Sequence, residues 1–216
     1  MVQCLMRGAT FGLFNAAFGV RDEDAQIDRA LARFAAIDVT PRFEVLERDL
    51  TPSLERRFQV RGLEPRGRRT LLRGQVAPGE PLPSDIVVER IHASSFDRFY
   101  ATDIAAGGNP EVRTAQAFRH WVDLEGWHLF LARMGPEAVG TAILFAHGGL
   151  GYLASAATRP EFRGRGVQRA LISARRKVAQ NLGLTTLGAR TEPDSISERN
   201  LQRAGLEAVA SVLVFS

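Results

Sequence analysis

The hydrophobic pattern divides the last three-fifths of the chain into alternating strands and helices. Apolar residues spaced three and four apart from Val167 to Leu182 predict an amphipathic helix with one buried stripe. The basic residues that we place outside this stripe are expected to face water, and they are Arg169, Arg175, Arg176 and Lys177. The other strands and helices predicted here are strand Ile86 to His92, helices Ser94 to Ala106 and Thr114 to Glu125, hairpin strands Trp127 to Met134 and Ala138 to Ala146, strands Gly151 to Ala157 and Leu184 to Arg190, a helix from Ser195 to Gly205, and a last strand from Leu206 to Phe215.

The first eighty residues show a second, shorter alternation of the same kind. The expected elements are a strand within Gly8 to Val20, a helix over Asp22 to Ala36, a strand over Pro41 to Leu50, a helix from Thr51 to Gly62 and a strand over Arg69 to Val76. Three prolines between Ala77 and Ser84 are typical of a linker. We therefore predict an α/β unit over residues 1–82 and a second unit over residues 83–216.

A loop rich in arginine and glycine joins a predicted strand to the long helix. The segment from Thr158 to Ala170 reads TRPEFRGRGVQRA. Gly164 and Gly166 lack a Cβ, so the backbone can approach a ligand closely or adopt positive φ. Arg163 and Arg165 supply cationic forks that match phosphate oxygens, and the helix start directs unpaired N–H groups to the same place. The loop is therefore a candidate phosphate site, although such a tetrapeptide alone is more often an ordinary basic turn.

Two well-known phosphate loops do not fit this segment. A dinucleotide-binding fingerprint needs a glycine or alanine where this chain has Arg169. A nucleoside-triphosphate loop needs Gly-Lys-Ser/Thr, and the only lysine of the chain, Lys177, lies within the predicted helix.

The segment does fit R-x-x-G-x-(G/A), except that Gln168 stands at the last position. With the preceding Arg-Pro-Glu-Phe, it resembles the acetyl-coenzyme A loop of the GNAT superfamily of N-acetyltransferases. The later segment SERNLQRAGLE, from Ser197 to Glu207, resembles the late helix of that family. The resemblance implies an α/β (α+β) fold with a mixed, mostly antiparallel central sheet flanked by helices. The unit at 1–82 would then be a degenerate GNAT-like half, with an unrelated α/β cap as the alternative.

The resemblance also implies a reaction and a set of binding residues. A primary amine of a small-molecule or protein acceptor would attack acetyl-coenzyme A directly, without a covalent enzyme intermediate and without a metal. The strands beginning at Gly151 and Leu184 would splay apart to admit the pantetheine arm. The residues that would contact the coenzyme are Ala156, Thr158, Arg163, Gly164, Arg165, Gly166, Val167, Gln168 and Asn200.

The proton transfers are less clearly assigned by the sequence. Many family members carry a tyrosine where this chain has Leu201, so Tyr152 is the candidate proton donor, and unassisted departure of the thiolate is the alternative. Glu192 is the candidate base, with a water relay left open. The other titratable residues considered for that role are Asp123, Glu125, His128, His147 and Asp194.

Composition narrows the remaining classes of function. The formal net charge is +4, and arginine supplies all of the basic residues except Lys177. Seven arginines between Arg56 and Arg73 could bind nucleic acid, but aromatic residues hardly interleave with them, so we rank this hypothesis last. A non-catalytic acyl-coenzyme A sensor ranks second.

The single cysteine, Cys4, excludes an internal disulfide, and we expect a bacterial, cytoplasmic protein. The apolar stretch Gly8 to Val20 is too short to span a bilayer and is not typical of a signal peptide, so no membrane partner is expected. The oligomeric state is left open, a homo-oligomer included.

Overall fold

The computed structural model describes residues 1–7, 15–77 and 85–216. Over these residues the helices are α1 (Asp24–Ala36), α2 (Pro52–Gln59), α3 (Phe96–Ala105), α4 (Val112–Trp121), α5 (Val167–Asn181) and α6 (Ile196–Arg203). The strands are β1 (Val2–Cys4), β2 (Ala16–Phe18), β3 (Phe43–Leu46), β4 (Pro65–Gln75), β5 (Ile86–Arg90), β6 (Trp127–Met134), β7 (Glu137–His147), β8 (Leu150–Thr158), β9 (Thr186–Thr191) and β10 (Glu207–Phe215). Short 3-10 turns lie at η1 (Glu47–Asp49), η2 (Ala93–Ser95) and η3 (Pro160–Phe162).

The strands form a mixed, mostly antiparallel open sheet, which confirms the predicted fold class. Their hydrogen-bonding order is β1-β2-β3-β10-β4-β9-β8-β7-β6-β5. Parallel pairing joins β2 to β3 and β8 to β9. The hairpin strands β6 and β7 match the predicted segments closely, because both carry strong apolar patterns and meet at a Gly135 turn with φ of +57°.

The described chain divides into two compact units. One comprises Met1–Leu71 and Val209–Ser216, and the other comprises Leu72–Ala208. The predicted boundary at residues 82/83, most of the predicted linker, and residues 8–14 of the predicted first strand lie outside the described residues. The helix, strand, helix and strand predicted between Asp22 and Val76 are present as α1, β3, α2 and β4.

An aromatic cluster holds the first unit together. Phe43 of β3 packs against Phe34 of α1 and Phe58 of α2, with ring centroids 5.9 Å and 5.2 Å away. Phe58 in turn lies 4.8 Å from Phe215 of β10. All four side chains are fully buried. Since large aromatic side chains contribute strongly to core energetics, this cluster stabilises the unit together with the aliphatic residues around it.

Ion pairs neutralise much of the basic cluster in the same unit. Arg57 lies 2.6 Å from Asp22, and Arg61 lies 2.7 Å from Asp28. Arg61 also holds Asp24 at 2.8 Å. The Arg57 and Arg61 guanidiniums, as hydrogen-bond donors, hold the pKa of Asp22 and Asp28 below the ordinary value, against the opposing effect of desolvation. These arginines therefore stabilise α1 against α2.

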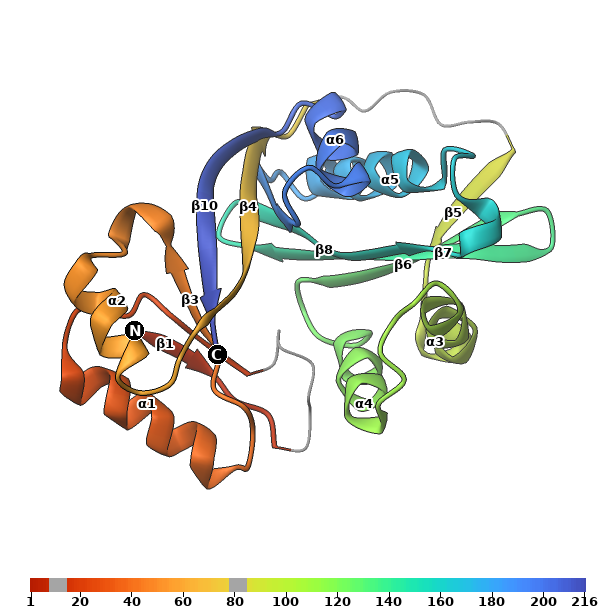
Figure 1. Ribbon diagram of the computed structural model, residues 1–216. Helices are drawn as coiled ribbons and strands as arrows, with labels where there is room; N and C mark the ends of the chain where they lie inside the picture. The colour runs from red at the N-terminus through yellow and green to blue at the C-terminus, as the bar shows by residue number, and fades with distance from the viewer. Residues whose placement is uncertain (8–14, 78–84) are drawn as a thin grey trace. The chain divides into compact units, whose positions relative to one another are not determined.

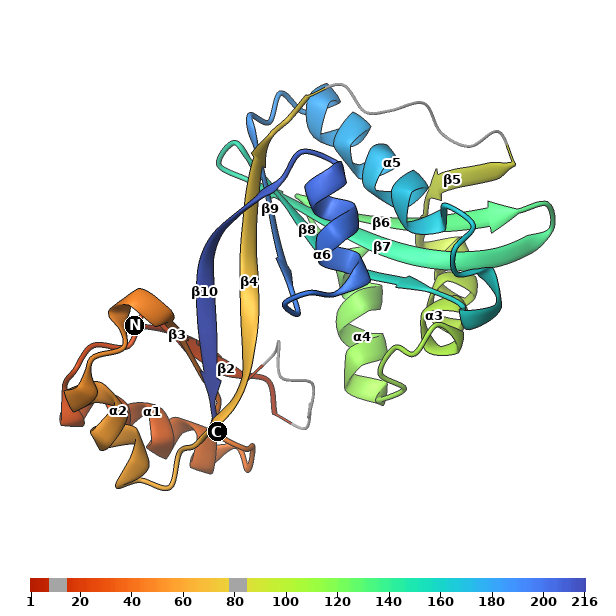
Figure 2. The same ribbon diagram turned by 45° about the horizontal axis from the view of Figure 1, so that its top comes forward.

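The second unit places helices on both faces of its strands. Figures 1 and 2 show α5 and α6 on one face of β5–β9, and α3 and α4 on the other. The core under α5 is a continuous cluster, and its fully buried members include Ala142, Leu144, Leu171 and Leu187. Within the described ranges, every helix is too short or too polar to span a bilayer.

The prediction that Arg175 and Arg176 face water is wrong. Both are buried, with 2% and 7% of their surface exposed, whereas Arg169 and Lys177 are exposed as predicted. Arg175 follows Leu171 by one helical turn, so it lies on the stripe that faces the sheet. Arg176 reaches the carbonyl of Ala204 after the end of α6. Each guanidinium therefore finds main-chain acceptors inside the protein.

We predict that Gly140 sets the distance between β7 and the first turn of α5. A Cβ at Gly140 would lie 2.8 Å from both the Ala157 carbonyl oxygen and Val167 Cγ1. Gly140→Ala should therefore lower the free energy of unfolding by about 1–3 kcal/mol, because overpacking displaces this turn. Gly67→Ala is the control, since its nearest contact would be an ordinary 3.6 Å. Urea denaturation of both variants is the measurement, and equal losses would contradict the prediction.

Candidate functional site

A β-bulge interrupts the ladder between β7 and β8. Ala142 pairs with Ala156 and Ile143 pairs with Ala154, so Ser155 is the extra residue of β8. Ser155 adopts a φ of +24°, which is unusual for a residue with a side chain. Bulges bend the strand that carries them and occur often beside functional sites.

β8 and β9 separate just before this bulge. Their parallel pairing joins Leu150 to Thr186, Gly151 to Leu187 and Tyr152 to Gly188, and ends there among the described residues. Both strands continue beyond this point. Ser155 and Ala156 are exposed although they lie on a strand in the middle of the sheet. The bulge and the parting strands therefore create an opening, as predicted for the strands beginning at Gly151 and Leu184.

Unpaired main-chain donors gather at the start of α5. Among the described residues, no acceptor is hydrogen-bonded to the amides from Gly164 to Arg169, and the first helical bond runs from Ala170 to the Gly166 carbonyl. Gly164 and Gly166 have φ of +75° and +84°, so both occupy the left-handed region that glycine favours. Free amides at a helix N-terminus form an anion site.

The loop arginines lie on the surface of this turn. Arg163 and Arg165 are both exposed. The Arg163 Nε donates to the Thr158 carbonyl at 3.3 Å, and the Arg165 guanidinium lies 5.4 Å from the Phe162 ring centroid. Since neither arginine has a carboxylate partner in the described part of the chain, both retain positive charge for an anionic ligand.

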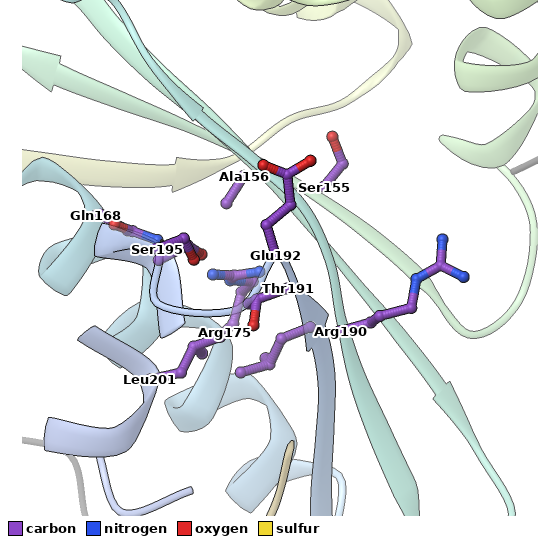
Figure 3. Close-up of a pocket in the computed structure, with 11 residues that line it drawn as sticks. Ser155, Ala156, Gln168, Arg175, Arg190, Thr191, Glu192, Ser195 and Leu201 are labelled. Carbon is purple, nitrogen blue, oxygen red and sulfur yellow. The ribbon is translucent and has the colours of Figure 1, made fainter. Parts of the chain in front are cut away.

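A pocket of about 280 Å³ opens beside the bulge. Figure 3 shows its lining, which comes from β8, α5, the end of β9 and α6. The lining residues are Leu153, Ser155, Ala156, Gln168, Arg175, Arg190, Thr191, Glu192, Ser195, Ser197 and Leu201. The pocket is thus reached both from the free amides of α5 and from the gap between the strands.

Gln168 joins the first turn of α5 to α6. Its Nε2 donates to Ser197 Oγ at 2.9 Å, and its Oε1 accepts from Asn200 Nδ2 at 2.6 Å. Ser195 caps α6 by accepting from the Glu198 amide at 3.1 Å, which confirms the predicted cap. The Glu198 carboxylate accepts from the Asp194 amide rather than from Ser195. Gln168 therefore spans the distance between the two helices at one side of the pocket.

Arg175 lies beneath the opening. Its Nη1 donates to the carbonyls of Ile143 and Ala154, both at 3.2 Å, and its Nε donates to Leu171 at 3.1 Å. Desolvation by burial lowers the pKa of Arg175 to about 9, so the side chain is still a cation at neutral pH. Thr191, which faces the same pocket, is also buried.

Tyr152 lies on the face of the sheet opposite α5. It pairs across strands with Phe145, which pairs with Trp127, so the three side chains share a face. Trp127 stacks on Trp121 of α4 at 3.9 Å, which identifies that face as the one covered by α3 and α4. Tyr152 is the last residue before the strands separate, so it lies beside the gap without lining the pocket.

Glu192 lines the pocket at the end of β9. Figure 3 shows its carboxylate directed toward the strand that carries Ser155 and Ala156. Of the other titratable candidates, His128 is buried on β6, and desolvation followed by the charge of Arg90 lowers its pKa. None of Asp123, Glu125, His128, His147 and Asp194 lines the pocket.

The structure thus brings together most of the residues singled out from the sequence. Ala156, Gln168 and Glu192 line the pocket, and Asn200 contacts Gln168. Thr158 ends β8, Arg163 to Gly166 form the loop, and Val167 begins α5. Sequence reasoning missed Arg175 and Thr191. The position of Arg175 one turn after Leu171 was the signal that could have placed it. Within the described ranges, no group of three or more His, Cys, Asp or Glu residues is arranged to hold a metal ion.

Solved structures of the same fold include acetyltransferases. A GCN5-related N-acetyltransferase from Kribbella flavida superposes with a TM-score of 0.73 at 20% identity, over 100% of this chain and 87% of its own. A second GCN5-related N-acetyltransferase, from Sphaerobacter thermophilus, superposes with a TM-score of 0.64 at 20% identity, over 88% of this chain and 64% of its own. AAC(6')-Iy, in complex with the bisubstrate analog CoA-S-monomethyl-acetylneamine, superposes with a TM-score of 0.52 at 20% identity. This alignment covers 57% of this chain and 92% of AAC(6')-Iy. At these identities the likeness establishes the fold alone.

Sequence comparison identifies the family directly. No curated protein matches the chain. The sequence model of the acetyltransferase (GNAT) family matches residues 94–205, which are more than half of the chain and include the bulge, the loop, α5 and α6. With its strand opening and its free amides at a helix start, the chain belongs to the GNAT acetyltransferase family.

Proposed function

We propose that this protein transfers an acyl group, in the simplest case acetyl, from its coenzyme A thioester to a primary amine. The observation that carries the proposal is the run of unbonded amides from Gly164 to Arg169 beside a gap between β8 and β9. A diphosphate fits those amides, and a pantetheine arm fits the opening that leads to the pocket. The complex of AAC(6')-Iy with an analog containing coenzyme A supports this use of the fold.

The chain would hold the donor mainly through its main chain. The amides from Gly164 to Gln168 would bind the diphosphate, with Arg163 and Arg165 adding charge at the rim. The free edge of β8 from Ala156 to Thr158 would present backbone groups to the pantetheine arm. Because strand and helix fix these groups before binding, little reorganisation is needed during the reaction.

The acceptor would approach from the face of the sheet that carries Tyr152. Its nitrogen attacks the thioester carbonyl carbon, the carbon–sulfur bond breaks, and the coenzyme leaves as a thiolate. We assign Glu192 to take the proton of the amine and Tyr152 to protonate the thiolate. Both lie at the edges of the opening, Glu192 at the end of β9 and Tyr152 where the strands part.

A non-catalytic coenzyme sensor is the second candidate function. Leu201 lines the pocket where many relatives carry a tyrosine, and Gln168 is hydrogen-bonded to α6 in the place of a small residue. Turnover of acetyl-coenzyme A with a panel of amines, measured together with thermal stabilisation by the coenzyme, distinguishes the two. Stabilisation without turnover of any amine would favour the sensor.

For the unit that contains α1, α2 and β3, a degenerate GNAT-like half remains a prediction. Its helix and strand order parallels the second half of the GNAT fold, and no Arg/Gly loop precedes α2. We propose a structural or substrate-shaping role for it rather than a second active site.

We predict that the two loop arginines contribute to coenzyme affinity. The double variant Arg163→Ala, Arg165→Ala should raise the Kd for coenzyme A roughly tenfold or more at low salt, because each loses a charged hydrogen bond to phosphate. Calorimetric titration measures this. Arg29→Ala with Arg33→Ala removes the same charge from the exposed face of α1 and is the control. Equal weakening by both double variants would refute a local phosphate site.

Tyr152→Phe should lower kcat roughly a hundredfold while leaving the Kd for coenzyme A unchanged, since only the proton donor is lost. Steady-state kinetics with the best amine of the panel provides the measurement. The matched control is Tyr100→Phe, whose hydroxyl instead donates to the Asn109 and Glu111 carbonyls. A kcat for Tyr152→Phe within twofold of the unaltered protein would favour unassisted departure of the thiolate.

Glu192→Gln should lower kcat/KM for the amine roughly a hundredfold at neutral pH, because the variant keeps the shape of the side chain and loses its basicity. The loss should shrink as the pH rises and the free amine becomes abundant. Glu161→Gln, an exposed glutamate that pairs with Arg159, is the control. If the ratio of kcat/KM between the variant and the unaltered protein stays constant across the pH range, Glu192 is not the base.

A further inference from the structure

The pocket contains a buried cation without a carboxylate partner. Arg175 is 2% exposed, and no ion pair involves it among the described residues. It follows Leu171 by one turn of α5, and its side chain reaches the carbonyls beside the bulge. Buried arginines are almost always paired, because an unpaired charge in a protein interior is costly. The main-chain carbonyls of Ile143, Ala154 and Leu171 satisfy part of its hydrogen-bonding capacity.

One arm of this guanidinium is not used inside the protein. The hydrogen bonds of Arg175 involve Nε and Nη1, and within the described part of the chain none involves Nη2. Because Arg175 lines the pocket, a ligand there can accept from this arm. The guanidinium fork is planar and held at three points, so the direction of the remaining donors is fixed.

A second polar group without a partner lies on β9 beside the same pocket, but its oxygen is enclosed by protein. Thr191 is 7% exposed, and its Oγ1 has no hydrogen-bond partner among the described residues. Figure 3 includes both Arg175 and Thr191 among the residues that surround the pocket. Of these two residues, Arg175 is therefore the one that offers a free donor to a ligand in the pocket.

The Arg175 guanidinium discriminates between kinds of acyl chain. A methyl group pressed against it would cover a cation with hydrocarbon and leave the Nη2 donors unpaired. A carboxylate would instead accept hydrogen bonds from Nη2 and neutralise the buried charge. The pocket of about 280 Å³ can hold such a chain, since a water molecule takes about 30 Å³ of liquid volume.

We propose that the preferred donor is the coenzyme A thioester of a short dicarboxylic acid, of the malonyl or succinyl kind, whose free carboxylate binds Arg175. This inference rests on the proposed function. In the transfer, the bond between the amine nitrogen and the thioester carbonyl carbon forms, and the carbon–sulfur bond breaks. The amine gives up one proton and the departing thiolate gains one, so the products are an amide and the free thiol of coenzyme A. The second carboxylate takes no part and remains on the amide product.

The test compares coenzyme A with its acetyl, malonyl and succinyl thioesters by calorimetric titration of the full chain at one ionic strength. For the unaltered protein, malonyl- or succinyl-coenzyme A should bind at least about tenfold more tightly than acetyl-coenzyme A. Arg175→Met should reduce this ratio to about one, and Arg175→Lys should retain part of it. Thr191→Val, which removes the enclosed hydroxyl at nearly constant volume, is the control and should leave the ratio unchanged.

The controls separate this inference from the proposed function and from a purely structural role. If all four compounds bind and acetyl-coenzyme A binds as tightly as the dicarboxylic thioesters, this inference is overturned and the proposed function stands. If none binds, both fail. A lower melting temperature for Arg175→Met with an unchanged affinity ratio would assign Arg175 to support of the bulge alone and overturn the inference. Should that variant not fold, the unaltered protein and Arg175→Lys decide the question.

Discussion

The interaction on which the site depends is the set of hydrogen bonds from Arg175 to main-chain carbonyls. The bulge at Ser155 interrupts the ladder between β7 and β8, and the backbone polar groups beside it need partners. Arg175 reaches across from α5 and donates to Ala154 of β8 and Ile143 of β7. The side chain thereby supports the bulge at Ser155 and ties the helix to the two strands that flank it. A bulge in the middle of a sheet is stable here because a cation inside the core satisfies the carbonyls beside it.

The start of α5 has a complementary constraint. Its amides are free because the loop before it adopts left-handed backbone conformations at Gly164 and Gly166. The close approach of Val167 to Gly140 then fixes this turn against β7. The same helix therefore serves two parts of the site. Its first turn presents free amides for an anion, and Arg175 on its third turn supports the bulge beside the opening. Both features lie within the residues that match the GNAT family model.

The sequence predicted the element order well because its signals are local. Apolar periodicity located α5, the Gly135 turn located the β6–β7 hairpin, and Ser195 with Glu198 located the start of α6. It could not predict what depends on distant neighbours. The bulge at Ser155 lies in a run of small residues with no pattern of its own, and Gln168 finds Ser197 and Asn200 only after folding. The sequence predicts an exposed Arg175 because charged side chains are rarely buried. In the structure, carbonyl acceptors on β7 and β8 make burial of this side chain possible.

The division of the chain into two compact units has a practical consequence for dissecting the protein. The first unit draws its last strand from the far end of the sequence, where Val212 to Phe215 pair with Leu46 to Phe43. A gene fragment that starts after the first unit would therefore carry an orphaned, aggregation-prone edge strand, and the complementary fragment would lack Phe215 from its aromatic cluster. Activity and its loss are better assigned by point substitution than by truncation, and split halves should be tested for mutual rescue when expressed together.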